Sequence, residues 1–160
     1  MTAVKSATSS DVAAIQRFAQ HVYTCQINDE NQRRRFLERV YSERSIQRSV
    51  DNEATAFYVA HKGDDVIGLA HFGSPLTEEC TDRKEIHRLL VHPDYTRQGI
   101  GEHFLEAMVA HYKSDLRVRQ FFVYVPQVEE SRAAFYRKHG YQRLSTQDRD
   151  GERYFYFNLP

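Results

Sequence analysis

Hydrophobic and polar positions follow a helical period near the start of the chain and a strand period through its middle. Over residues 11–25 the apolar positions recur at helical spacing, which predicts a helix with Ser9 or Ser10 as its cap. The short run at residues 3–7 is typical of an edge strand. Residues 29–50 are highly charged but carry an apolar stripe, so we expect one or two further helices there.

The second half of the chain alternates between strand and helix patterns. The expected strands and helices cover, in chain order, residues 56–61, 66–72, 85–93, 99–113, 119–125, 129–139 and a closing hairpin over 141–160. The first two runs are β-rich and are joined by a turn, which predicts an antiparallel pair. The strand, helix, strand order from 85 to 125 is typical of a parallel crossover. We therefore expect an α/β fold of the mixed, α+β kind.

Composition favours one compact domain over residues 1–160, because 41% of the residues are hydrophobic and no linker, repeat or low-complexity segment interrupts the chain. Neither a signal peptide nor a run of about 18 apolar residues is present, so we expect a soluble cytoplasmic protein without a membrane partner. Lys plus Arg equal Asp plus Glu, which gives no field to attract nucleic acid. Cys25 and Cys80 are expected to be ordinary thiols.

Two glycines, Gly99 and Gly101, stand where the strand pattern gives way to the helix pattern. Glycines at such a junction let backbone N–H groups point outward at the positive end of a helix, which is a place that binds phosphate. A dinucleotide fingerprint would need a third glycine at the position of Phe104, and a Walker loop would need Lys and Ser or Thr at Glu102 and His103. Both of these phosphate motifs are excluded.

The run "EIHRLLVHPDYTRQGIGEHFLEAM" and the later "AAFYRKHGY" resemble two signature motifs of the GNAT superfamily of N-acetyltransferases. The resemblance covers nearly all of the chain. It implies the acyl-CoA N-acyltransferase fold, with a mixed central sheet of six to seven strands flanked by about four helices. It also implies an enzyme that moves the acetyl group of acetyl-CoA to a primary amine by direct attack in a ternary complex.

The resemblance places coenzyme contacts along the first motif. Main-chain groups of the strand would pair with the pantetheine arm and polarise the thioester carbonyl, while the loop amides would cradle the pyrophosphate. These cofactor-binding residues are Leu89, Val91, Thr96, Arg97, Gln98, Gly99, Ile100 and Gly101. Two positions depart from the family pattern, since Thr96 replaces an Arg or Gln and Glu129 replaces an Asn.

Three residues are candidates for proton transfer. Tyr136 matches the family's tyrosine that protonates the departing thiolate, although it also fits the pattern of a core aromatic. A protonated amine must lose a proton before it attacks, so a general base is needed. Glu85 is the first candidate and His87 the second, because strand alternation puts both on the face of Val91. Both also fit a surface position at the end of a strand.

The acceptor is expected to be a small molecule, either a polyamine or an amino-acid-like amine. Acidic residues Glu78, Glu79 and Asp82 favour a cationic amine unless they form a solvated loop. The basic run at 32–35 would meet the 3′-phosphate of coenzyme A, an acidic acceptor or only solvent. Residues 30–60, followed by the run 85–95, have a loose resemblance to the PaiA-like branch, which acetylates polyamines.

Two other functions stay open: a protein N-terminal or lysine acetyltransferase, and a catalytically weak CoA-binding regulatory module. The histidines have no metal-ligand spacing, so we expect no metal. The aromatic run 154–157 covers both faces of the last strand, which favours either a homodimer contact or an inner strand of the sheet.

Overall fold

The computed structural model describes residues 2–75 and 82–160, so the predictions for Glu78, Glu79 and Cys80 lie outside the described residues. The strands, in chain order, are β1 Val4–Ser6, β2 Thr55–Lys62, β3 Asp65–Gly73, β4 Arg83–Val91, β5 Gln120–Pro126, β6 Gln142–Arg143 and β7 Glu152–Asn158. They form a seven-stranded sheet in the order β1-β2-β3-β4-β5-β7-β6. The parallel pairing of β4 with β5 and the antiparallel pairing of β5 with β7 make the sheet mixed, as the sequence predicts.

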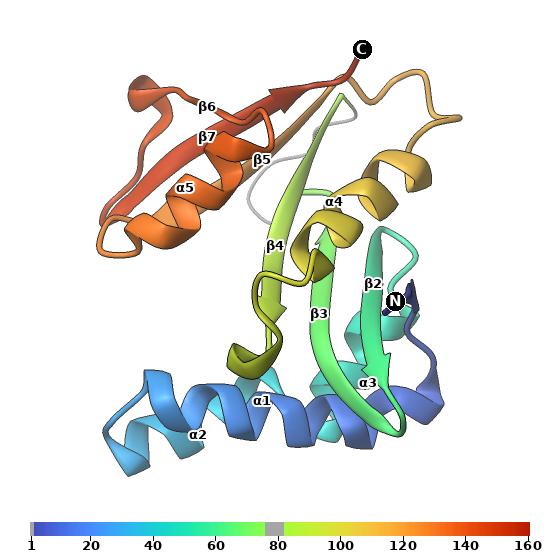
Figure 1. The fold of residues 1–160 in the computed structure, drawn as a ribbon, viewed down its shortest axis with the longest axis vertical. Coiled ribbons are helices and arrows are strands. Elements are labelled where there is room, and N and C mark those ends of the chain that lie inside the picture. The colour runs from blue at the N-terminus through green and yellow to red at the C-terminus, as the bar shows by residue number, and fades with distance from the viewer. Residues whose placement is uncertain (1, 76–81) are drawn as a thin grey trace. The chain divides into compact units, whose positions relative to one another are not determined.

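The helices are α1 Val12–Gln26, α2 Glu30–Val40, α3 Glu43–Asp51, α4 Ile100–His111 and α5 Glu130–Lys138. The charged stretch at 29–50 thus forms two helices, and each is preceded by a residue whose side chain accepts a hydrogen bond from a backbone N–H. Asp29 Oδ1 accepts from Gln32 at 2.9 Å, and Ser42 Oγ accepts from Ser45 at 3.2 Å. The order and type of the predicted elements are confirmed by the structure (Figure 1).

Two compact units make up the chain: Met1–His71 with Arg88–Ala107, and Phe72–His87 with Met108–Pro160. In the first unit the apolar face of α1 is buried in a core with α3 and the strands β2, β3 and β4. This core includes Ile15, Phe18, Val22, Tyr41, Ile46, Val59, Leu69 and Leu90. Figure 1 shows α1, α2 and α3 grouped together along this part of the sheet. The periodic apolar positions of the sequence therefore mark the buried face, as expected.

The predicted cap of the first helix is wrong. Ser9 and Ser10 lie inside a single 3₁₀ turn, Ser9–Asp11, that precedes α1. The turn is closed from the other direction, because the Asp11 carboxylate accepts a hydrogen bond from the backbone N–H of Thr8 at 2.8 Å. An acid three residues after a threonine satisfies the capping-box geometry, and this arrangement competes successfully with a serine cap.

In the second unit, β7 lies between β5 and β6. It pairs with β5 from Gln120–Asn158 to Pro126–Glu152, and with β6 through Gln142–Tyr156 and Arg143–Phe155. The aromatic last strand is therefore an inner strand, which is one of the two expected explanations. Gly140, after α5, has a φ of 91° and ends that helix in the left-handed conformation that the sequence predicts.

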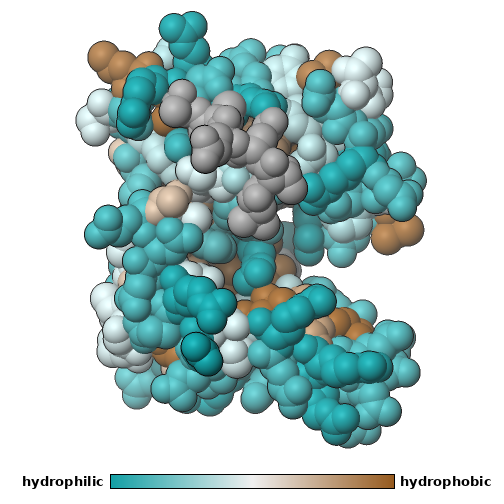
Figure 2. All heavy atoms as spheres, turned by 180° about the vertical axis from the view of Figure 1, so that it is seen from behind, coloured by the Kyte–Doolittle hydropathy of each residue, from teal (hydrophilic) through white to brown (hydrophobic). Residues whose placement is uncertain are grey.

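Hydrophilic residues dominate the face of the molecule that Figure 2 shows. Within the described residues, every helix is too short or too polar to span a lipid bilayer.

Candidate active site

The loop between β4 and α4 has a backbone that few sequences adopt. After the 3₁₀ turn Pro93–Tyr95, Thr96 is extended, with a φ of −67° and a ψ of 155°. Arg97 and Gly99 then take positive φ values of 65° and 81°. Two left-handed residues separated by one position turn successive N–H groups toward the same side of the chain, which is the geometry of an anion-binding nest.

The N–H groups of this loop are available to a ligand. The first hydrogen bond of α4 runs from His103 N to Gly99 O at 3.0 Å. Within residues 2–75 and 82–160, no backbone hydrogen bond uses the N–H groups of 97–101. A Cβ on Gly99 would meet no atom within 4 Å, so the space beside its Cα is open. The loop and the positive end of α4 together fit a phosphate group.

Packing beneath the loop holds α4 in place. Gly68 of β3 lies under the first turns of the helix, where an added Cβ would be 3.1 Å from the Phe104 ring and 3.2 Å from Ile100. Both of these side chains are buried, at 1% and 2% exposure. The absence of a side chain at Gly68 therefore lets the helix end that carries the free amides approach the sheet closely.

His92 anchors the start of the loop, and sequence reasoning missed it. Its backbone N–H donates to Ile67 O at 2.8 Å, and its Nδ1 accepts from the N–H of Asp94 at 3.1 Å. Its ring stacks on His21 of α1, with centroids 4.5 Å apart. A side-chain acceptor directly before proline at a turn was the available signal. Thr96 also has a structural contact, because its hydroxyl donates to Pro93 O at 3.2 Å.

The second half of β4 is only in part buried. Leu90 is buried at 7% exposure, whereas Leu89 and Val91 are only partly buried. The pairing of β4 with β5 covers Arg83, Lys84 and Glu85. Among the described residues, no pairing with β5 is found for 86–91. Main-chain groups along this part of β4 are therefore candidates for pairing with an extended ligand.

Glu85 and His87 lie inside the molecule. The two side chains are 10% and 5% exposed, and Glu85 Oε2 lies 3.8 Å from His87 Nδ1. The structure thus brings the two candidate bases together and excludes their interpretation as surface residues at a strand end. A carboxylate beside an imidazole can take a proton and pass it on through a short path.

Tyr136 lies on the inner side of α5 and is 2% exposed. Its ring contacts Tyr141 and Phe135, each with centroids 5.2 Å apart. Burial raises the pKa of the Tyr136 hydroxyl above its usual range, while the charge of Arg132 partly offsets this and that of Glu129 adds to it. The hydroxyl therefore keeps its proton at neutral pH, as a proton donor must.

Glu129, at the position where the resemblance expects asparagine, forms an ion pair with Arg132 at 3.0 Å. It also precedes the first residue of α5 without a capping hydrogen bond from its side chain. This residue thus contributes a local charge pair at the start of the helix that carries Tyr136.

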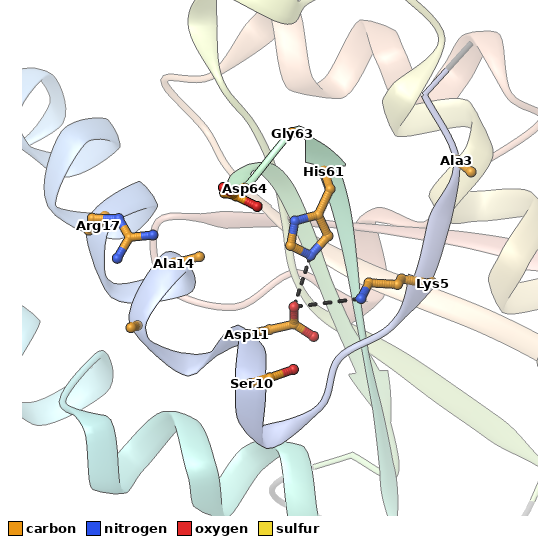
Figure 3. A pocket seen from close by; sticks show the side chains of 10 residues that line it. Ala3, Lys5, Ser10, Asp11, Ala14, Arg17, His61, Gly63 and Asp64 are labelled. Atoms are coloured by element: carbon orange, nitrogen blue, oxygen red, sulfur yellow. Dashed lines mark hydrogen bonds and ion pairs between the residues drawn. The ribbon is translucent and has the colours of Figure 1, made fainter.

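A hollow of about 580 Å³ in the first unit shares no residue with the loop (Figure 3). Asp11 lies in its wall and is 4% exposed. His61 Nε2 lies 2.9 Å and Lys5 Nζ 3.7 Å from its Oδ1. Burial opposes ionisation, but hydrogen bonds from Thr8 and His61 outweigh it and lower the pKa of Asp11. The contacts of the Asp11 carboxylate with Lys5 and His61 therefore link the start of α1 to β1 and β2.

In the described part of the chain, no group of three potential metal ligands comes together.

Comparison with protein-family models identifies the family of this chain. Residues 53–143 match the model of the acetyltransferase (GNAT) domain, and the chain belongs to this family of acyltransferases. The comparison with curated proteins finds no significant match.

Solved structures of acetyltransferases share the fold. The PaiA N-acetyltransferase of Thermoplasma acidophilum, solved with coenzyme A, is similar with a TM-score of 0.82, 18% identity and 99% coverage of both chains. A GNAT acetyltransferase of Staphylococcus aureus gives 0.76, 14% identity and 100% coverage of both chains. The ribosomal-protein-S18-alanine N-acetyltransferase of Escherichia coli gives 0.66 and 17% identity, with coverage of 100% of this chain and 94% of that one. At these identities the likeness concerns the fold.

Proposed function

We propose that this chain is a single domain over residues 1–160 that transfers the acetyl group of acetyl-CoA to a primary amine of a small molecule. The observation that carries the proposal is the loop with left-handed Arg97 and Gly99, whose outward N–H groups fit a pyrophosphate. A similar structure that contains coenzyme A covers 99% of this chain, which supports both acetyl-CoA as the cosubstrate and a single domain.

Two segments of the chain bind acetyl-CoA in this proposal. Amides of Arg97, Gln98, Gly99, Ile100 and Gly101 bind the diphosphate, with Thr96 fixing the loop through Pro93. Main-chain groups of Leu89 and Val91 pair with the pantetheine arm, and an amide there polarises the thioester carbonyl. Acetyl-CoA supplies a thioester whose carbon the amine attacks.

Proton transfer falls to the buried groups. Glu85, with His87 beside it at 3.8 Å, takes the proton from the ammonium form of the acceptor so that its nitrogen can attack. Tyr136 gives a proton to the departing thiolate. The thiol has a pKa of about 8.5 and so leaves readily, which makes this last assistance modest. The cytoplasmic location, the homodimer and the absence of a metal stay predictions.

The test measures binding and turnover separately. Calorimetry with acetyl-CoA should show binding to the wild type and none to Gly99→Glu, because a carboxylate at that position would repel the phosphates. Gly63→Glu is the matched control, since Gly63 also has a positive φ, of 62°, and open space around it but lies in the β2–β3 turn. Binding that persists in Gly99→Glu would contradict the assignment of the loop.

Release of free coenzyme A, measured with amino acids, polyamines, aryl-alkylamines and short peptides, then identifies the acceptor. Turnover that is confined to a class of small amines supports the proposal. Turnover with peptides alone would indicate a protein acetyltransferase instead.

A further inference from the structure

Arg88, in the second half of β4, is a half-buried cation that lacks a carboxylate partner among the described residues. Two other half-buried arginines do have one. Arg132 pairs with Glu129 and Arg153 with Glu130, each at 3.0 Å. The guanidinium carbon of Arg88 instead lies 5.1 Å from the centre of the Tyr41 ring.

Aromatic side chains of the first unit hold Arg88 in place. Tyr41 is 3% exposed, and the rings of Tyr23 and Phe36 pack around it with centroids 5.6 Å and 6.0 Å away. Burial raises the pKa of the Tyr41 hydroxyl, and Tyr23 adds to this, whereas the charge of Arg88 opposes it. Tyr23 and Phe36 are themselves only partly buried, so the cluster has an accessible side.

Within the described part of the protein, this arrangement leaves most of the hydrogen-bonding capacity of the Arg88 guanidinium unused. A guanidinium carries five N–H donors in a rigid fork, and stacking on a ring occupies its face rather than its edge. One phenol oxygen cannot satisfy five donors. A half-buried cation is stabilised most by a carboxylate, whose two oxygens match the fork.

The position of Arg88 along β4 indicates which ligand could use these donors. Arg88 directly precedes Leu89, whose main chain is assigned to the pantetheine arm of the coenzyme under the proposed function, on which this inference rests. We infer that the acceptor is a primary amine that also bears a carboxylate, as an amino acid does, and that Arg88 binds that carboxylate. A polyamine is disfavoured, because its charge would be repelled by the guanidinium.

The experiment compares pairs of acceptors that differ in one group, an amino acid and its C-terminal amide, with Arg88→Gln, Arg88→Lys and wild type. The wild type should use the acid better than the amide. Arg88→Gln should lower kcat/KM for the acid by about 10-fold to 100-fold, which corresponds to the loss of a charge-assisted bidentate pair, and leave the amide little changed. Arg88→Lys should recover part of the difference, because it keeps the charge without the fork.

Arg48→Gln, an exposed position on α3, makes the same charge change and should not alter the preference. Equal losses for acid and amide in Arg88→Gln, or preferential acetylation of polyamines by the wild type, would overturn the inference while leaving the acetyltransferase proposal intact. Failure of the wild type to bind acetyl-CoA in calorimetry would instead overturn the proposed function itself. Thermal unfolding of each variant shows whether the fold is kept.

Discussion

Tyr136 offers the sharpest test of chemistry at a single residue. Its hydroxyl is buried and its pKa is raised chiefly by that burial, so it is protonated whenever the thiolate leaves. Tyr136→Phe keeps the ring and removes only the proton donor. We expect kcat to fall by about 10-fold to 100-fold, at or below the low end for general acid catalysis because the thiol is a good leaving group, with the Kd of acetyl-CoA unchanged. Steady-state kinetics and calorimetry measure the two quantities. Tyr141→Phe, which changes another buried tyrosine in contact with the first, is the control and should retain turnover.

The sequence could predict which residues form the loop after β4, but not the contacts that hold this loop in place. Two glycines at a strand-to-helix junction predict open amides; in the structure Gly99 has a positive φ, whereas Gly101 lies in the first turn of α4. By contrast, the stack of His92 on His21 is a contact between segments far apart in the chain, and the left-handed φ of Arg97 has no signal in the sequence. Likewise, a strand pattern places Glu85 and His87 on one face but says nothing of their burial, which is set by tertiary packing.

Among the elements, the junction of β1, β2 and α1 depends on Asp11. Its pKa is lowered in the folded state, so its contribution to stability is present above the unfolded value of about 3.9 and is lost as the pH falls through the folded value. Asp11→Asn should reduce the free energy of unfolding at pH 7 by about 1–3 kcal/mol, because hydrogen bonds to a buried charge are lost. It should also flatten the decline in stability below about pH 4. Urea unfolding at pH 7 and pH 3 measures both effects. Asp64→Asn, in the wall of the same hollow but exposed, is the control. An unchanged acid slope in Asp11→Asn would contradict the assignment.

Element order and type followed from hydrophobic period, whereas element ends depended on local hydrogen bonds. The break between α2 and α3 is set by Ser42, which accepts a backbone N–H at 3.2 Å. The apolar stripe runs through both helices, so period alone could not decide between one helix and two. The last strand was ambiguous for a similar reason. Aromatic residues on both of its faces fit an inner strand and a subunit contact equally well, and only its pairing with both β5 and β6 distinguishes them.

At the scale of the whole molecule, acetyl-CoA should stabilise the chain as one cooperative unit. The proposed single domain, although composed of two compact units, predicts one calorimetric transition whose calorimetric and van't Hoff enthalpies agree. Because the ligand binds only the folded state, a concentration of about 100 times its Kd adds about 2.7 kcal/mol. For a chain of this size that corresponds to a rise in Tm of roughly 5–10 °C. The Gly99→Glu variant should unfold at its own Tm with no shift. Two separate transitions, of which acetyl-CoA moves only one, would show that the units unfold independently and would contradict the single domain.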